Sequence, residues 1–301
     1  MSSRIAFIGA GRLAQCLAPA LAEQGESIVA VASRDPDSAR RLAAQLPGSH
    51  ALTPAQCVAQ ADLVFISTPD DAIATLTASL PWRVGQAAVH CSGATGLEAL
   101  AAAREAGAMV GGFHPLQIFS DPRSARERLA GSLVAIETPD EGLRTQLLRL
   151  AGRLGLHPLA ISGGQRAAYH AAANVAASGL LAVLSEACGL FEDLGLGPGE
   201  ALAALMPLAR GALDAASQRG LPEAIAGPVA RGDARVLAAH LNVMAARGED
   251  TLQLYRWLSR RQLDLLAGSG RPDSAGREAL AALLAAVPRS GPEHPAGAGK
   301  T

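Results

Sequence analysis

The sequence predicts an α/β fold, in which a domain built on a mostly parallel sheet is followed by an all-α C-terminal domain. Three observations support this prediction. First, an apolar run at residues 5–8 leads into the glycine-rich stretch GAGRLA. Second, apolar runs then alternate with helical stretches to about residue 163. Third, only helical patterns follow that point. Alternating strands and helices are typical of a parallel sheet covered by helices on both faces.

The composition is that of a globular protein with ample core material. Hydrophobic residues make up 49% of the 301 residues, charged residues 18% and aromatic residues 3%, and the net charge is −1. The near-zero charge and scarce aromatics give no support to nucleic-acid binding. We find no signal peptide, no uninterrupted apolar run of about 18 residues and hence no predicted membrane span. The four cysteines are far apart in the sequence, so they indicate a reducing cytoplasm and no metal site.

Lysine is almost missing from this chain, because Lys300 in the C-terminal tail is the only one. The folded body therefore has no lysine for acid catalysis, Schiff-base chemistry or a P-loop. Cationic chemistry must come from arginine.

The stretch GAGRLA at residues 9–14 matches the dinucleotide fingerprint G-x-G-x-x-A of Rossmann-type domains. In that motif the glycines permit a tight turn and close approach of the backbone to the pyrophosphate, at a helix N-terminus. The strand before it and the helix through about residue 21 provide the expected context. We predict cofactor contacts from this turn, namely Gly9, Ala10, Gly11, Arg12 and Leu13.

The second strand, residues 28–32, ends in Ser33-Arg34. NAD-specific sites usually carry an acidic residue here to bind the ribose hydroxyls. A hydroxyl and a guanidinium suit a 2′-phosphate, so the sequence predicts NADP(H). Asp37 is a candidate cap for the next helix.

Further strands are predicted at 62–67, 87–91, 108–113, 132–137 and 156–162, with a helix from about residue 141. Ligands of doubly wound sheets bind at the carboxyl ends of the strands. We therefore predict that Ser67, Thr68 and Pro69 bind cofactor and that Ser92 binds substrate, although the hydroxyls of Ser92 and Thr68 are also compatible with ordinary turns. His114 precedes Pro115 in what we expect to be a loop and is a candidate catalytic residue.

The α/β pattern stops at Gly163-Gly164, so we expect a cofactor domain at 1–163, a helical substrate and dimerisation domain at 164–288, and a disordered tail at 289–301 rich in Gly and Pro. Helices are predicted at about 165–193, 198–218, 222–226, 233–247, 249–268 and 273–287, separated by Gly and Pro.

The first of these helices carries a polar stripe on an otherwise apolar segment. Arg166, His170, Asn174 and Ser178 follow one another at four-residue spacing, which places them on one helix face. We expect this stripe to face a cleft between the domains. Arg166 is suited to binding a carboxylate, His170 to donating a proton and Asn174 to orienting the reacting group. Tyr169 and Ser178 are predicted to bind substrate.

The loop at residues 226–233, AGPVARGD, is the last candidate. Asp233 is expected to cap the next helix. Arg231 is either an anion-binding residue or part of a structural interaction with Asp233.

The segments GAGRLA, HCSGA, GGFHPLQIF, RAAYHAAA and AGPVARGD together resemble a bacterial family that joins a Rossmann-like domain to a "domain of unknown function 2520", a family of predicted short-subunit dehydrogenases. The resemblance covers about residues 4–287. More distantly, the layout is similar to that of ketopantoate reductases, pyrroline-carboxylate reductases, deazaflavin-dependent NADP reductases and β-hydroxyacid dehydrogenases.

The resemblance implies an NADP-dependent oxidoreductase that dimerises through its helices. β-Hydroxyacid dehydrogenases and ketopantoate reductases use a lysine where this chain has Arg166, which stays charged and cannot easily donate a proton. Relatives also tend to carry Asn at the position of Ser178, and here Asn174 lies one turn earlier.

Our leading sequence-based hypothesis is NADPH-dependent reduction of a small carboxylate-bearing carbonyl compound, a 2-oxo acid such as ketopantoate. The alternatives are an imine reductase of the pyrroline-carboxylate type and a non-catalytic NADP-binding sensor.

Overall fold

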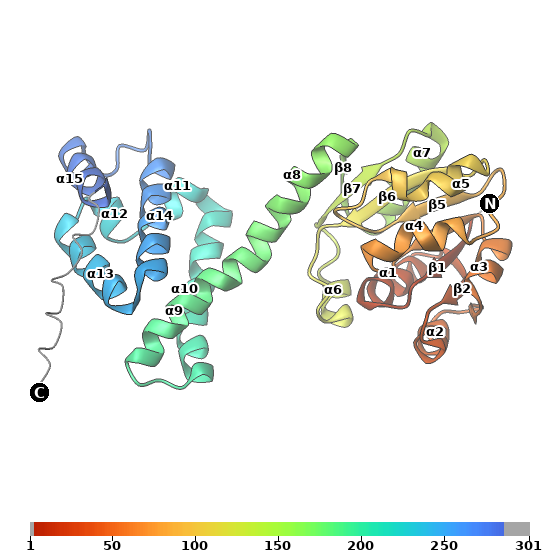
Figure 1. Cartoon of the computed structure of the whole chain (residues 1–301), viewed down its shortest axis with the longest axis horizontal. Helices are drawn as coiled ribbons and strands as arrows, with labels where there is room; N and C mark the ends of the chain where they lie inside the picture. The colour runs from red at the N-terminus through yellow and green to blue at the C-terminus, as the bar shows by residue number, and fades with distance from the viewer. Residues whose placement is uncertain (1–2, 286–301) are drawn as a thin grey trace, which may run out of the picture. The chain divides into compact units, whose positions relative to one another are not determined.

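The computed structural model describes residues 3–285 (Figure 1). The chain divides into two compact units, one ending at Leu180 and the other beginning at Leu181. The sequence-based boundary at 163 falls earlier, because we assigned the whole helix that follows Gly163 to the second domain. The predicted tail at 289–301 lies outside the described residues.

The first unit is built on one eight-stranded sheet with the order β3-β2-β1-β4-β5-β6-β7-β8. The strands are β1 (Arg4–Ile8), β2 (Ser27–Ala32), β3 (His50–Ala51), β4 (Leu63–Ile66), β5 (Ala87–His90), β6 (Met109–Pro115), β7 (Leu133–Glu137) and β8 (His157–Ala160). Neighbouring strands from β3 through β6 are parallel; β7 is antiparallel to β6, and β8 is parallel to β7. This confirms the predicted mostly parallel sheet.

The central strands are buried on both faces, which explains their continuous apolar runs. Ile5 and Phe7 of β1 lie in one core cluster, whereas Ala6 and Ile8 lie in another on the opposite face. Phe7 stacks on Phe65 with ring centroids 5.1 Å apart. Successive side chains of a strand point to opposite faces, so a short apolar run supplies both cores.

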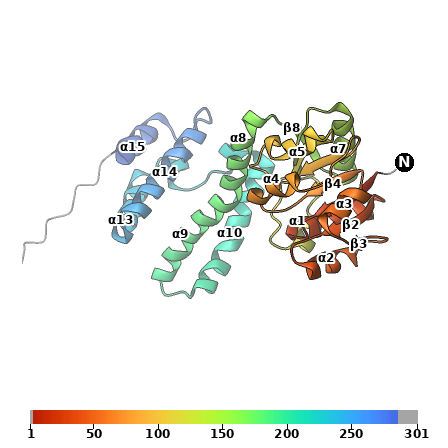
Figure 2. The ribbon, with the colours of Figure 1, turned by 45° about the vertical axis from the view of Figure 1, so that its right-hand side comes forward.

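Helices cover both faces of the sheet (Figures 1 and 2). The first core cluster includes residues of α1 (Arg12–Glu23), α2 (Pro36–Ala43), α6 (Pro122–Glu127) and α7 (Glu141–Arg153). The second includes residues of α3 (Pro54–Gln60), α4 (Asp70–Ala78), the 3₁₀ turn η1 (Leu97–Leu100) and α5 (Ala101–Glu105). The sheet is thus the middle layer of three, as the alternating pattern predicts.

The first unit ends with α8 (Gly163–Asn174) and a π-helical turn, η2 (Val175–Gly179), after which α9 (Leu180–Asp193) continues the same helix. By length and composition alone, Gly163–Asp193 is the one described helix that is long and apolar enough to cross a membrane, with a hydropathy of 1.5. None of its most apolar window is buried, unlike a core helix, and a single helix of this kind is weak evidence for a membrane span.

The second unit is helical throughout the described residues. After α9 it contains α10 (Pro198–Arg219), α11 (Leu221–Ala224), α12 (Pro228–Arg231), α13 (Ala234–Arg247), α14 (Glu249–Leu265) and α15 (Ser274–Ala285). The helices α13, α14 and α15 pack on one another (Figure 2) around a core that includes Leu237, Leu252 and Leu280. The predicted all-α C-terminal region is therefore confirmed.

Several local expectations require correction. His114 lies within β6, paired with Ala135 of β7, and not in a loop. The cap of α2 is Asp35, whose carboxylate accepts from the backbone N–H groups of Asp37 and Ser38, and not Asp37. The loop at 226–233 contains the short helix α12, whereas the expected Asp233 cap of α13 is present.

Candidate active site

The turn between β1 and α1 can be formed only with glycine at position 9. Gly9 has φ of +115°, and a Cβ atom there would lie 2.4 Å from the backbone oxygen of Ser67. Gly11 caps α1 with extended backbone and no side-chain hydrogen bond, so the first N–H groups of α1 are free of side-chain caps. A Cβ at Gly11 would meet nothing within 4 Å. The turn thus leaves space in front of a helix N-terminus.

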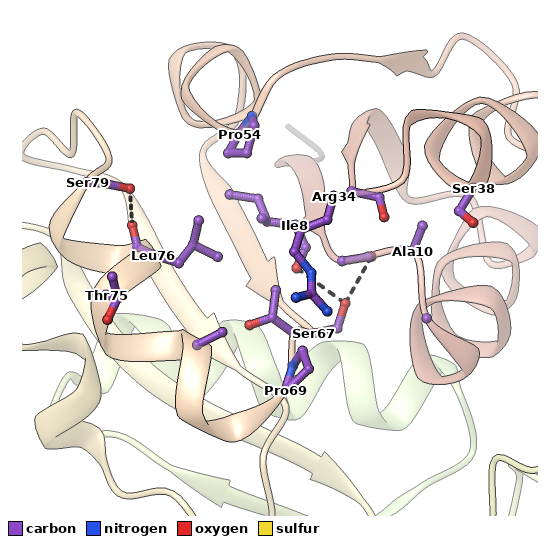
Figure 3. A pocket seen from close by; sticks show the side chains of 15 residues that line it. Ile8, Ala10, Arg34, Ser38, Pro54, Ser67, Pro69, Thr75, Leu76 and Ser79 are labelled. Carbon is purple, nitrogen blue, oxygen red and sulfur yellow. Dashed lines mark hydrogen bonds between the residues drawn. The ribbon is translucent and has the colours of Figure 1, made fainter.

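A cavity of about 880 Å³ lies beside this turn (Figure 3). The predicted cofactor residues that line it are Gly9, Ala10, Gly11, Ser33, Arg34, Ser67, Thr68 and Pro69. Figure 3 shows the Arg34 side chain pointing into it. The size and concave shape suit a ligand larger than a typical metabolite, such as a dinucleotide.

Two predicted cofactor residues, Arg12 and Leu13, are not among the residues that line the cavity. Sequence reasoning also missed Ser38, Pro54, Ala72, Thr75, Leu76 and Ser79, which do line it. Ser38 lies in α2, Pro54 begins α3, and Ala72, Thr75 and Leu76 lie in α4, with Ser79 directly after its end. Their apolar and hydroxyl side chains carry no signal that distinguishes a cofactor wall from an ordinary helix surface.

Thr68 provides a direct test of whether a ligand fits this cavity. Its Oγ1 is buried and has no hydrogen-bond partner within the described residues, although it lines the cavity. The neighbouring Ser67 hydroxyl is satisfied, because it donates to the backbone oxygen of Gly9 over 3.1 Å. Buried hydroxyls rarely remain unpaired, so Thr68 has the geometry expected of a residue that bonds to a bound cofactor.

Arg166 does not face an open cleft, so this expectation is wrong. Its side chain is only 3% exposed and is paired with Glu137 of β7. Nε and Nη2 donate to Glu137 Oε2, and Nη1 donates to the backbone oxygen of Ser92 over 2.9 Å. With all three nitrogens engaged and the charge compensated, Arg166 is not available to bind a substrate carboxylate.

The residues of the polar stripe do not share one environment, because residues four apart are rotated by about 40° around a helix. Arg166 is buried in the first turns of α8, whereas His170 and Asn174 are exposed. Ser178, also exposed, lies in the π-helical turn. Four residues that looked equivalent in the sequence therefore have different environments.

Ser92 has the structural role that we considered as its alternative. Its hydroxyl is buried and accepts from the backbone N–H groups of Ala94 and Thr95 over 3.1 and 2.9 Å. This is ordinary turn chemistry. The prediction that Ser92 binds substrate is therefore corrected. Its hydroxyl bonds within its own loop, and its backbone oxygen accepts from Arg166.

Three predicted site residues do gather around one glycine. A Cβ at Gly93 would lie 2.7 Å from His170 Nδ1 and 2.9 Å from both Cε1 and Nε2 of His114. The rings of His114 and His170 have centroids 6.3 Å apart. Tyr169 completes the group, with its hydroxyl 3.0 Å from His114 Nδ1. We call Gly93, His114, Tyr169 and His170 the histidine cluster.

Burial makes His114 an uncharged imidazole at neutral pH. Desolvation, together with the nearby His170 and Arg166, lowers its pKa to about 4. Burial also raises the pKa of Tyr169 to about 12, so its phenol stays protonated. His114 and Tyr169 therefore offer neutral hydrogen-bonding groups, and His170 is the exposed member of the cluster.

His90 is a buried residue that sequence reasoning missed. It is the last residue of β5, and neither ring nitrogen has a hydrogen-bond partner within residues 3–285. Burial and the nearby Arg166 lower its pKa to about 3. The only signal was its place in the HCSGA segment, where it appeared to be an ordinary strand residue.

Arg231 belongs to the second unit, in α12. It is exposed, and the predicted Arg231–Asp233 interaction is not formed, because the Asp233 carboxylate caps α13 through the backbone N–H of Val236.

The fold and the cavity are those of a dinucleotide-binding oxidoreductase, and comparison with known proteins supports this class. Residues 4–92 match the family described as "NADP oxidoreductase coenzyme F420-dependent", and residues 132–262 match a "domain of unknown function" family, DUF2520. These matches agree with two of the resemblances noted in the sequence and support NADP(H) as cofactor. No curated protein matches the chain.

Solved structures share the fold over most of the chain. A proposed NADP oxidoreductase of Bacteroides fragilis is 26% identical, with a TM-score of 0.67, covering 87% of this chain and 98% of that one. A Thermotoga maritima protein is 23% identical, with a TM-score of 0.72 and coverages of 89% and 100%. A reductive aminase of Aspergillus terreus, solved with NADPH, is 18% identical, with a TM-score of 0.63 and coverages of 92% and 98%.

Proposed function

We propose that this protein is an NADPH-dependent reductase of C=N bonds in small molecules. The observation that carries the proposal is the buried ion pair of Arg166 with Glu137, which removes the expected carboxylate-binding cation from the histidine cluster. What remains there is an uncharged His114, a protonated Tyr169 and the exposed His170. These groups suit a protonated imine, which already carries its proton, better than a ketone, whose developing alkoxide needs a charged group to stabilise it.

NADPH, when bound, supplies a hydride. The residues that would hold it are Gly9 and Gly11 at the start of α1, Arg34 at the end of β2 and Thr68 after β4. Arg34 offers its guanidinium to the 2′-phosphate, and the unpaired Thr68 hydroxyl offers one further hydrogen bond.

Protonated imines need less from the protein than ketones do. An imine gains a proton in solution more easily than a ketone, so no side chain has to protonate a developing alkoxide. Solved structures of this fold include proteins named as an imine reductase from Pseudomonas and a pyrroline-5-carboxylate reductase from Coxiella burnetii. These likenesses support the fold only, and the choice of a C=N substrate depends on the histidine cluster.

The second candidate is reduction of a 2-oxo acid such as ketopantoate, our leading hypothesis from the sequence. The exposed guanidinium of Arg231 in the second unit favours it, because that group is not committed to Asp233. In this case His170 would protonate the alkoxide oxygen, with Asn174 orienting the substrate.

We further propose that the protein forms a homodimer in the cytoplasm. The helices from η2 to α10 expose large apolar side chains, including Val175 at 70%, Leu181 at 63% and Leu208 at 72%. Apolar surface of this kind is typical of interfaces between subunits. Cys16, Cys57 and Cys91 are buried free thiols, which agrees with a reducing compartment.

The experiment that tests the proposed function replaces His170 with Ala and measures NADPH oxidation with a cyclic imine and with a 2-oxo acid. If the substrate is a protonated imine, turnover persists within about tenfold of wild type. If His170 is a general acid for a ketone, turnover falls by about a hundredfold or more. A protein that binds NADPH tightly and reduces neither compound would be a sensor, and the proposal would be wrong.

A further inference from the structure

We propose that Tyr169 is a positioning residue that fixes His114 in its Nδ1–H tautomer. The bare Nε2 of His114 then accepts a hydrogen bond from the protonated nitrogen of the substrate. This inference rests on the proposed function for the identity of the substrate. The tautomer itself depends only on the contacts between His114 of β6 and Tyr169 of α8.

The hydrogen bonds around Tyr169 determine which nitrogen of His114 carries the proton. The Tyr169 hydroxyl donates to the backbone oxygen of His114 over 3.2 Å. The hydroxyl oxygen of Tyr169 also lies 3.0 Å from His114 Nδ1. A phenol has one proton to donate.

Only one tautomer satisfies both contacts. If Nδ1 carries the proton, the Tyr169 oxygen accepts from Nδ1, and its own proton bonds to the His114 carbonyl. If Nδ1 is bare, Tyr169 must direct its proton there, and the contact to the carbonyl is lost. Partly buried groups keep their hydrogen bonds, so the Nδ1–H form is favoured and Nε2 holds a lone pair.

The bare Nε2 is the nitrogen of His114 that a ligand would meet, because within the described residues only Nδ1 has a hydrogen-bond partner and His114 is partly exposed. Nε2 of His114 and Nδ1 of His170 both lie within 3 Å of the position that a Cβ at Gly93 would occupy. Glycine at position 93 lets the two rings pack this closely, since a Cβ there would clash with both of them. The desolvated ring of His114 remains uncharged near neutral pH, so the lone pair is available as an acceptor.

An acceptor at this point distinguishes between the two substrate classes. A protonated imine has an N–H⁺ that can donate to Nε2, whereas a carbonyl oxygen has only lone pairs and would be repelled. In the reaction a hydride from NADPH forms the new C–H bond. The π electrons of the C=N bond become the lone pair of the amine nitrogen, which retains its proton. His114 stays neutral throughout.

The test is ¹⁵N NMR of the seven histidines in the full-length protein without substrate. His114 is assigned by the signals that disappear in His114→Gln. We expect protonated Nδ1 and unprotonated Nε2 in wild type, and a shift of the proton toward Nε2 in Tyr169→Phe. That variant should also lose at least about tenfold in kcat/KM for a cyclic imine, as for one lost hydrogen bond, with the Kd for NADPH unchanged.

The second unit provides a matched control, because Tyr255 and His240 form a similar pair with 2.7 Å between Oη and Nδ1. Tyr255→Phe should alter only the His240 signals. A protonated Nε2 on His114 in wild type, or signals of His114 that do not change in Tyr169→Phe, would overturn the inference. The expected tautomer combined with no imine turnover would instead overturn the proposed function and leave the tautomer assignment in place.

Discussion

Arg166 and Glu137 form a buried ion pair that joins the first turns of α8 to the antiparallel strand β7. A third bond from Arg166 holds the backbone of Ser92, which directly precedes Gly93. One side chain therefore connects α8 and the loop at Gly93, which carry three members of the histidine cluster, to β7, the strand that pairs with β6 and His114. We propose that Arg166 positions the site and does not contact the substrate.

We expect Glu137→Ala to destabilise the protein by about 3–5 kcal/mol, because it leaves the buried Arg166 charge without a partner. Chemical denaturation measures this loss. Asp264→Ala, which breaks the exposed pair with Arg261, is the control and should cost less than about 1 kcal/mol. Similar losses in both variants would show that the Glu137 pair is not a buried structural contact.

The choice of cofactor should depend on Arg34. Arg34→Asp removes a cation that lines the cavity and adds repulsion to a 2′-phosphate, so NADPH affinity should fall about ten- to a hundredfold while NADH affinity holds or improves. Arg40→Asp makes the same charge change at an exposed, paired arginine of α2 and should have little effect. Titration of both cofactors provides the measurement, and equal losses for NADPH and NADH in Arg34→Asp would contradict this role.

The two glycines of the fingerprint should differ in what they tolerate. Gly9→Ala places a Cβ 2.4 Å from the Ser67 oxygen at a positive φ, so we expect a loss of stability larger than about 1–3 kcal/mol. Gly11→Ala meets no atom within 4 Å and should fold normally but bind NADPH more weakly, because the methyl group occupies space beside the pyrophosphate. Melting temperatures and NADPH titrations separate the two effects. A fully stable Gly9→Ala would contradict the tight contact.

The stability of the protein should decrease in mild acid because of His90 and His114. Their folded-state pKa values, about 3 and about 4, lie below the ordinary value of 6.5. Between these values and 6.5 the unfolded chain binds more protons, so the free energy of unfolding falls as the pH falls. The contribution of His114 amounts to about 3 kcal/mol by pH 4. Urea unfolding from pH 7 to pH 4.5 should show this decrease, and His90→Gln should make it less steep. An equally steep decrease in that variant would contradict the buried, neutral His90.

Local patterns were sufficient to predict the parallel core, because each central strand is a short apolar run between turns. They could not predict the direction of β7. The segment between β6 and β7 carries only the short helix α6, and the sequence does not indicate whether such a connection returns antiparallel. The strand β3 has two exposed residues and carries no hydrophobic signal.

Site residues were predicted correctly where their position depends on one short segment of the sequence. They were predicted only in part where their environment depends on residues far away in the sequence. The glycine turn and Arg34 lie beside the cavity, as their own sequence context indicated. The burial of Arg166 depends on Glu137, which is 29 positions away, and the environment of His114 depends on Tyr169, which is 55 positions away. Helical spacing places side chains on a face but does not reveal what packs against that face.

The central claim is that the histidine cluster accepts a protonated C=N bond. The most direct measurement is the ratio of kcat/KM values for a cyclic imine and for a branched 2-oxo acid such as ketopantoate, determined from NADPH oxidation by the same purified protein. The account predicts that the imine is reduced at least about tenfold more efficiently, in keeping with one hydrogen bond to Nε2 of His114 that a ketone cannot make. Efficient reduction of the 2-oxo acid with no reduction of the imine would contradict it.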